Sequence, residues 1–91
     1  MQNSISSTYQ NEYRQESPTA VPLSSIMSGN RVRLVKINAE KNVKGRFLAL
    51  GLIPGTEISV ISNAGKGPLL IALGESRMTF GRGMAEKIVV E

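Results

Sequence analysis

The sequence predicts a mainly β fold: a small, strongly bent antiparallel barrel of about five short strands, with one short helix inserted after the first strand. Short apolar or alternating segments recur along the chain, as half-buried strands require. Turns containing glycine or proline separate these segments. Residues 41–50 show the apolar spacing of an amphipathic helix of two to three turns. Frequent turns between short strands are typical of a bent, nearly closed sheet.

The composition limits the chemistry that this chain can perform. A chain of 91 residues suits one small domain. It contains no cysteine, histidine or aspartate, so disulfides, thiolate and imidazole ligands and the usual catalytic triads are absent. We therefore predict a protein that is not an enzyme, with no catalytic residues, no metal ligands and no cofactor. With no membrane-length apolar run and no secretory signal pattern, we expect no membrane span and a cytoplasmic location.

Charge and polarity divide the chain into two parts. Residues 1–22 are rich in Ser, Gln, Asn and Thr, which predicts a disordered polar tail. Residues 23–91 form the predicted domain and carry ten basic and five acidic residues, a net charge of +5. A basic domain of this kind suits nucleic acid, an anionic membrane or an acidic protein face, and a solvated surface is the remaining alternative.

The first long strand is expected at residues 31–37, after a turn at 28–30. Val32 and Leu34 share one face of this strand, and Val35 and Ile37 share the other. A bulge near Leu34 would turn both pairs inward, as occurs where a strand curves around a small barrel.

The inserted helix is expected at about residues 41–50. Val43, Phe47 and Leu50 recur at i, i+4 and i+7 and define its core-facing stripe, while Lys44 and Arg46 face outward. Gly45 weakens the helix, so packing against the barrel must hold it.

The segment from Phe47 to Gly55 is the corner around which the chain is organised. Gly51 suits the left-handed position that closes a helix. Pro54 and Gly55 supply the fixed negative and permitted positive φ of a type II turn. These three residues are therefore assigned a structural role, and the strand after the turn should begin near Thr56.

The rest of the barrel follows from short patterns. Further strands are expected at 56–62, 69–73, 76–80 and 88–90. Gly74-Glu75 fits a two-residue type II′ hairpin turn, and Met78 and Phe80 should point inward from the strand that follows it. Gly81-Arg82-Gly83 follows a strand but lacks the complete glycine motifs of nucleotide-binding loops, so a corner turn is preferred over a phosphate site.

The order of these residues resembles the FeoA family of ferrous iron transport proteins. The resemblance rests on the Arg46–Ile58 segment, with its Leu-Gly-Leu-Ile-Pro-Gly core, and on the final Ala85–Val90 segment. It covers about residues 23–91. It implies an SH3-like barrel with a helix after the first strand, and family-level transition metal ion binding. It also implies a small cytoplasmic accessory to a membrane iron transporter that carries a GTPase domain, peripheral at the inner face of the membrane through that partner. Met27-Ser28-Gly29 departs from the charged residue and Pro-Gly that the family often has there.

Four residues are predicted to contact the partner: Lys44, Arg46, Leu52 and Ile53. We expect Leu52 and Ile53 to be partly exposed at the corner, with Lys44 and Arg46 around them, because exposed apolar atoms with a basic rim suit an interface. The alternatives are a nucleic-acid-binding barrel and an SH3-like interaction domain related to those of metal-dependent repressors. The shortage of aromatic residues among the basic positions argues against nucleic acid. Weak self-association stays open.

Overall fold

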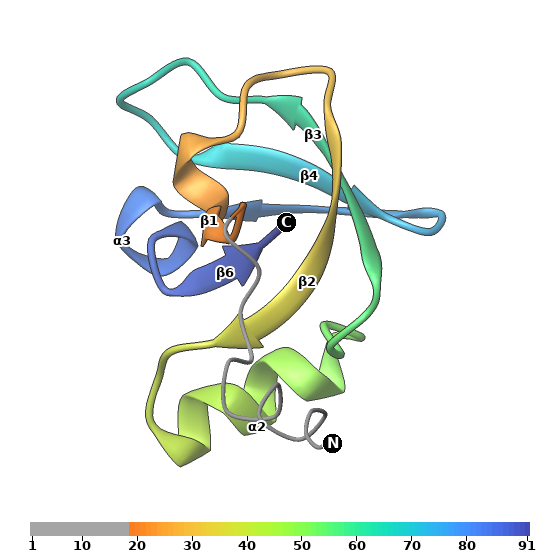
Figure 1. Ribbon diagram of the computed structural model, residues 1–91, viewed down its shortest axis with the longest axis vertical. Coiled ribbons are helices and arrows are strands. Elements are labelled where there is room, and N and C mark those ends of the chain that lie inside the picture. The colour runs from red at the N-terminus through yellow and green to blue at the C-terminus, as the bar shows by residue number, and fades with distance from the viewer. Residues whose placement is uncertain (1–18) are drawn as a thin grey trace, which may run out of the picture.

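The computed structural model describes residues 19–91, so the predicted tail lies outside the described residues apart from 19–22. The elements in order are β1 (Val21–Pro22), the 3-10 turn η2 (Leu23–Ser25), β2 (Arg31–Ile37), α2 (Lys41–Ala49), β3 (Glu57–Ser62), β4 (Leu69–Leu73), β5 (Ser76–Phe80), α3 (Arg82–Ala85) and β6 (Ile88–Val90) (Figure 1). The mainly β prediction, with a helix after the first long strand, is confirmed. β1 is a sixth, two-residue strand that begins before the predicted boundary at Leu23.

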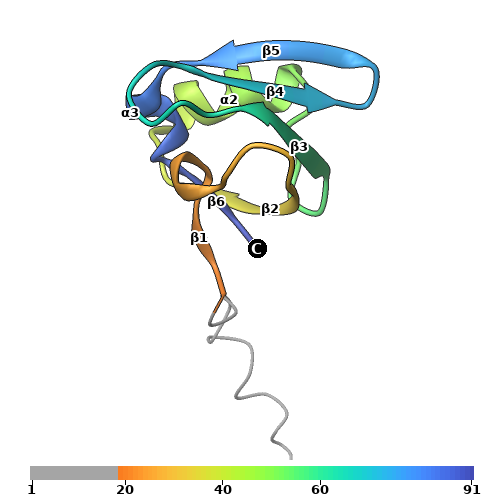
Figure 2. The same cartoon turned by 90° about the horizontal axis from the view of Figure 1, so that it is seen from above.

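The strands form one antiparallel sheet in the order β1-β6-β2-β3-β4-β5. β2 joins the two halves of this sheet: Arg31 pairs with Ser59 of β3, whereas Ile37 pairs with Ile88 of β6. The sheet therefore bends along β2, and Figure 2 shows β3, β4 and β5 on one side of the barrel with β2 and β6 on the other.

A bulge marks the bend in β2, as predicted. The register with β6 shifts between Leu34 and Lys36. Leu34 and Ile37 are buried and Val32 packs against the core, but Val35 is only half-buried and lies outside the core cluster. The prediction that both pairs turn inward is therefore wrong for Val35. A bulge adds one residue to the strand, so Val35 takes the extra position and brings Ile37 into phase with Leu34.

The barrel encloses one apolar core. The buried residues are Leu23, Leu34, Ile37, Phe47, Leu52, Ile58, Val60, Leu69, Ile71, Phe80, Ala85, Ile88 and Val90. None of the buried residues within 19–91 is polar or charged. α2 joins this core through Phe47, whose ring meets that of Phe80 edge to face, with centroids 5.5 Å apart and planes at 71°. One aromatic contact thus ties the inserted helix to β5.

The β4–β5 hairpin has the predicted two-residue turn. Leu73 pairs with Ser76, and Gly74 between them has a φ of 62°. Phe80 is buried and Met78 packs against the core, as the alternation in this strand predicts.

Candidate functional site

The end of helix α2 is fixed by a glycine in the left-handed conformation. Gly51 has a φ of 96°, and its N–H donates to the Leu48 carbonyl, with N and O 3.0 Å apart. The Leu52 N–H donates to the Phe47 carbonyl, also at 3.0 Å. These two bonds define a Schellman motif, in which the residue after the glycine packs back against the last turn of the helix. The motif brings Leu52 under the helix, where it is buried with Phe47.

A type II turn follows and is bound to β2. The Thr56 N–H donates to the Ile53 carbonyl at 2.9 Å, and Gly55 has a φ of 94°. Leu34 uses both of its backbone groups on this corner: its carbonyl accepts from Gly55 N at 2.7 Å, and its N–H donates to the Thr56 carbonyl at 2.9 Å. The corner is therefore held beside the middle of β2.

Two leucines at the corner exchange the environments that the sequence predicts. Leu52, expected to be partly exposed, has 0% of its surface exposed, and Leu50, expected on the core-facing stripe, is 51% exposed. Helical spacing does place Leu50 on the same side as Phe47, but α2 ends at Ala49 and Leu50 is its C-cap residue. The left-handed turn at Gly51 then reverses the chain, so that Leu52 fills the space that a longer helix would have given to Leu50.

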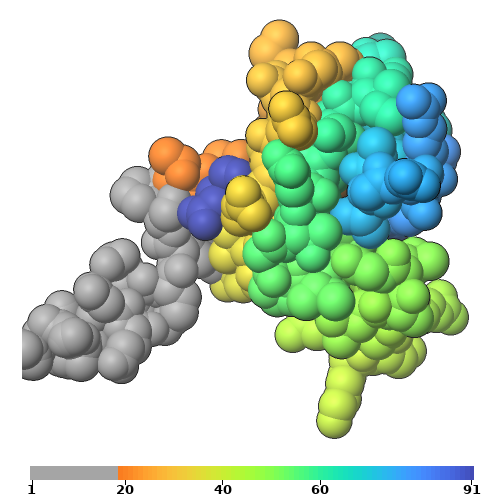
Figure 3. Space-filling view, turned by 90° about the vertical axis from the view of Figure 1, so that its right-hand side faces the viewer, coloured from red at the N-terminus to blue at the C-terminus, as the bar shows by residue number. Residues whose placement is uncertain are grey.

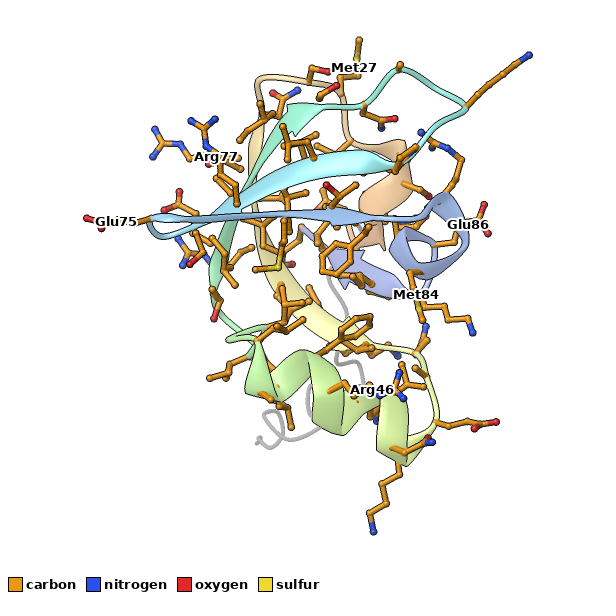
Figure 4. All side chains as sticks on the ribbon, turned by 180° about the vertical axis from the view of Figure 1, so that it is seen from behind. Met27, Arg46, Glu75, Arg77, Met84 and Glu86 are labelled. Carbon is orange, nitrogen blue, oxygen red and sulfur yellow. The ribbon has the colours of Figure 1, made fainter. Side chains whose placement is uncertain are left out.

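Three half-exposed aliphatic side chains surround the end of α2, with Leu48 on the flank of Lys44 and Leu50 on the flank of Arg46. Leu48, Leu50 and Ile53 are 50%, 51% and 51% exposed, and we call these three residues the α2-end patch. Within residues 19–91 the other large exposed apolar side chains are Val21 and Met27. α2 and the corner project beyond the end of the barrel (Figure 3), and Met27 lies at the opposite end from Arg46 of α2 (Figure 4). Exposed apolar surface is thus concentrated at the α2 end.

Beside this patch, two adjoining hollows run between α2 and β2. The first, of about 250 Å³, is lined by Lys36, Ile37, Lys44, Leu48, Leu52 and Pro54. The second, of about 470 Å³, is lined by Ile37, Asn38, Ala39, Glu40, Lys44 and Lys87. The two share Ile37 and Lys44 in their linings and therefore adjoin, and together we call them the α2–β2 trough. Its Pro54 end is apolar and its Lys87 end is polar.

The structure brings together only some of the four predicted contact residues. Lys44 and Leu52 both line the trough, with Leu52 as part of its buried floor, and Ile53 belongs to the patch. Arg46 lies about 200° around the helix axis from Lys44 and is therefore on the other flank of α2. Leu48 was missed by the sequence reasoning, although its position four residues after Lys44 places it on the same flank.

The glycine-flanked Arg82 is engaged in internal hydrogen bonds. Its guanidinium donates to the carbonyls of Ser24 and Gly67, at 3.2 and 3.1 Å, and to the side-chain oxygen of Asn63. These bonds join η2, the β3–β4 loop and the first residue of α3. The corner turn that the sequence favours is present, and the arginine serves to hold it.

Other site chemistry is sparse in the part of the chain that the structure describes. Residues 19–91 contain no group of three His, Cys, Asp or Glu residues placed to hold a metal ion. The two aromatic residues in this range, Phe47 and Phe80, are both buried, so neither offers a stacking surface. Among the helices of the same range, none has the length and apolar character needed to cross a membrane.

Exposed aliphatic side chains beside a lysine-lined trough are features typical of protein-binding surfaces, and the fold is that of a small barrel without catalytic chemistry in the described residues. Comparison with known families identifies the domain: the FeoA domain model matches residues 21–91. The chain therefore belongs to the FeoA family, as the sequence resemblance indicated. Membership of this family also bears out the prediction that the protein is not an enzyme.

Individual relatives agree with this assignment. A putative Fe(2+) transport protein A from Methanocaldococcus jannaschii is 36% identical over 70 residues, which cover 77% of this chain and 84% of that protein. The crystal structure of FeoA described as an iron uptake regulatory protein matches with a TM-score of 0.72 and 32% identity, over 80% of this chain and 96% of that one. Stenotrophomonas maltophilia FeoA, an SH3 domain protein solved with zinc, matches with a TM-score of 0.70 and 22% identity, over 78% and 89%. The barrel is thus SH3-like.

Proposed function

We propose that this protein is a cytoplasmic accessory of ferrous iron uptake that binds the cytoplasmic part of a membrane iron transporter bearing a GTPase domain. Membership of the FeoA family supports the link to iron transport, as does the 36% identical relative described as a putative Fe(2+) transport protein A. In this proposal the protein works at the inner face of the membrane and modulates the transporter without any catalysis of its own.

The α2-end patch is the single observation that carries the proposal. Three aliphatic side chains, each about half exposed, lie within six residues of one another around a rigid corner. Covering them with a partner would remove apolar surface from water at little ordering cost, because the Schellman motif and the type II turn already fix the backbone. Lys44 and Leu48 lie on one flank of α2, and Arg46 and Leu50 lie on the other. A partner that covers the end of the helix would therefore meet apolar side chains bordered by both basic residues.

Binding to the cytoplasmic part of the transporter tests this proposal. We expect Ile53→Asp to weaken binding strongly, because it places a charge in the apolar centre of the interface. Met27→Asp is the matched control: Met27 is 73% exposed at the opposite end of the molecule, so the same change there should leave binding unaltered. Both variants should keep the melting temperature of the parent protein. Equal binding by all three proteins would refute the assignment of this surface.

Leu52, one of the predicted contact residues, is unsuitable for this test. Its side chain is fully buried, so replacing it by aspartate would unfold the helix end instead of removing a contact. The predicted contacts are therefore tested through exposed residues such as Ile53 and Lys44.

A further inference from the structure

We infer that the α2–β2 trough receives an acidic, extended segment of the partner protein, with one large apolar side chain seated at the Pro54 end. This inference rests on the proposed function and specifies the chemistry of the partner. Neither the exposed patch alone nor the net charge of the domain identifies such a segment. The shape and polarity of the trough do.

The apolar end of the trough has the construction of a side-chain pocket. Ile37 and Leu52 are buried to 7% and 0% exposure and form its floor, while Leu48 and Pro54 are exposed beside them. A volume of about 250 Å³ suits one large side chain and excludes a whole helix. The corner cannot close over this space, because Leu34 holds both Gly55 and Thr56 in place through backbone hydrogen bonds. The pocket is therefore preformed.

The charges that line the trough favour a negatively charged ligand. Its lining includes three lysines, Lys36, Lys44 and Lys87, and one acidic residue, Glu40, for a net charge of +2. Lys44 stands where the two hollows meet, and Lys87 is at the polar end. The Asn38 N–H donates to the Lys87 carbonyl at 2.7 Å, which fixes the backbone of Lys87 beside the end of β2. Carboxylates that follow the apolar anchor along the trough would meet Lys44 and then Lys87.

An extended chain fits this pattern better than the other anionic partners. Membranes and nucleic acids present a continuous charged surface, and neither places a single apolar side chain in a narrow pocket. The domain of a second copy, residues 23–91, carries a net charge of +5 and is therefore a poor source of an acidic segment. Lys36 lines the apolar hollow, Lys44 lines both hollows, and Lys87 and Glu40 line the polar one. This excess of lysines beside an apolar hollow matches a segment in which an apolar residue precedes spaced carboxylates.

The test is a titration of the full-length, isotope-labelled protein with a short synthetic peptide, in which one phenylalanine is followed by spaced glutamates. We expect amide shifts confined to residues 36–40, 44–54 and 87, and binding that weakens as salt is added. Lys44→Glu and Lys87→Glu should each weaken binding by about fivefold or more. Lys66→Glu makes the same charge change on an exposed loop outside the trough and should leave the affinity unchanged. A peptide with serine in place of the phenylalanine should lose most of the binding.

Several results would overturn the inference. These are shifts that map outside the trough, equal binding by the lysine variants, or equal binding of the serine peptide. Concentration-dependent shifts of the same residues without peptide would assign the trough to a second copy, and binding to anionic vesicles but not to the peptide would assign it to lipid. The proposed function and this inference can be refuted separately. Ile53 does not line the trough and Lys87 is not in the patch, so transporter binding that depends on Ile53 but not on Lys87 would refute only the inference made here.

Discussion

At the scale of single residues, the backbone conformation of two glycines determines where the helix ends and where the next strand begins. Gly51 and Gly55 both have positive φ, at 96° and 94°, a region that costs other residues about 1–2 kcal/mol. A Cβ at Gly51 would lie 3.4 Å from Cδ2 of Leu73, at the edge of ordinary van der Waals contact, so the positive φ is what requires glycine there. Gly45, in contrast, has helical backbone and no neighbour within 4 Å of a Cβ. Glycine is therefore required at the corner and dispensable within the helix.

Replacing these glycines by alanine should change stability in opposite directions. Gly51→Ala should lower the free energy of unfolding by about 1 kcal/mol or more, because of the positive φ. Gly45→Ala should raise it by up to about 1 kcal/mol, because alanine is the better helix former. Thermal melting would resolve both, at about 4–8 °C per kcal/mol for a domain of this size. A Gly51→Ala protein that melts at or above the parent temperature would contradict this account.

The same positions show what local sequence can predict. Glycine and proline report the backbone conformation directly, so the helix end, the corner and the β4–β5 hairpin follow from residues next to one another. Val35 and Leu50 were misplaced because their burial depends on where an element stops or bulges. An alternating or helical pattern assigns each residue to a face from its spacing alone. It does not show that a bulge shifts this spacing at Val35, or that the helix ends before Leu50.

At the scale of elements, the short helices and turns are held by contacts that are distant in sequence. α2 depends on Leu52, which follows it, and on Phe80 of β5. The 3-10 turn η2 and the single-turn helix α3 have no side-chain caps, and Arg82 links them through bonds to Ser24, Asn63 and Gly67. Asn63 adds its own bonds from Nδ2 to the carbonyls of Ser24 and Ile26, at 3.0 and 2.8 Å. None of these partners can be read from the local pattern.

The helix end gives a clear contrast between two leucines. Leu52→Ala should lower the free energy of unfolding by about 2–5 kcal/mol, because it leaves a cavity below α2. Leu50→Ala removes a half-exposed side chain and should change that value by about 0.5 kcal/mol or less. Urea unfolding of both variants measures the difference. Similar losses would mean that the two residues do not have the burial described above.

The Arg82 bonds make a second element-level prediction. Arg82→Met keeps much of the side-chain volume but removes all three of these donated hydrogen bonds. The Gly67 carbonyl loses its Arg82 donor, whereas the Ser24 carbonyl keeps the Asn63 Nδ2 bond and Asn63 Oδ1 keeps the Gly65 N–H bond. We therefore expect a loss of about 1–3 kcal/mol. Arg77→Met, on exposed β5, is the matched control and should have little effect. Hydrogen exchange should also quicken around η2 and α3 in the Arg82 variant. Unaltered exchange there would show that the arginine does not join these elements.

At the scale of the whole molecule, the barrel core lies apart from the surface that we propose for interaction. The strands supply most of the core, and α2 with its corner supplies the exposed apolar surface and one wall of the trough. The fold class, the inserted helix and five of the strands could be predicted from the sequence, because each element shows a local pattern of apolar spacing bounded by turn residues. The trough was not, because it exists only where β2, α2 and Lys87 meet after the sheet has bent.

The two-residue strand β1 extends the sheet before the boundary that the sequence predicts. Val21 pairs with Val90 and Pro22 with Val89. We therefore expect a fragment of residues 23–91 to melt at a lower temperature than one of residues 19–91, because it loses this pairing and uncovers the edge of β6. Comparing the two fragments by calorimetry tests this directly. Identical melting temperatures would show that the pairing of β1 adds no stability and that the stable fold begins at Leu23.

The pairing of β1 with β6 also has a practical outcome. The start of β1 and the carboxyl end of the chain leave from the same side of the barrel (Figure 2), and α2 lies elsewhere. A fluorophore, a fused reporter or a biosensor chip attached at Glu91 would therefore stay clear of the proposed recognition surface. Immobilised in this orientation, the protein would present that surface uniformly to any candidate passed over it.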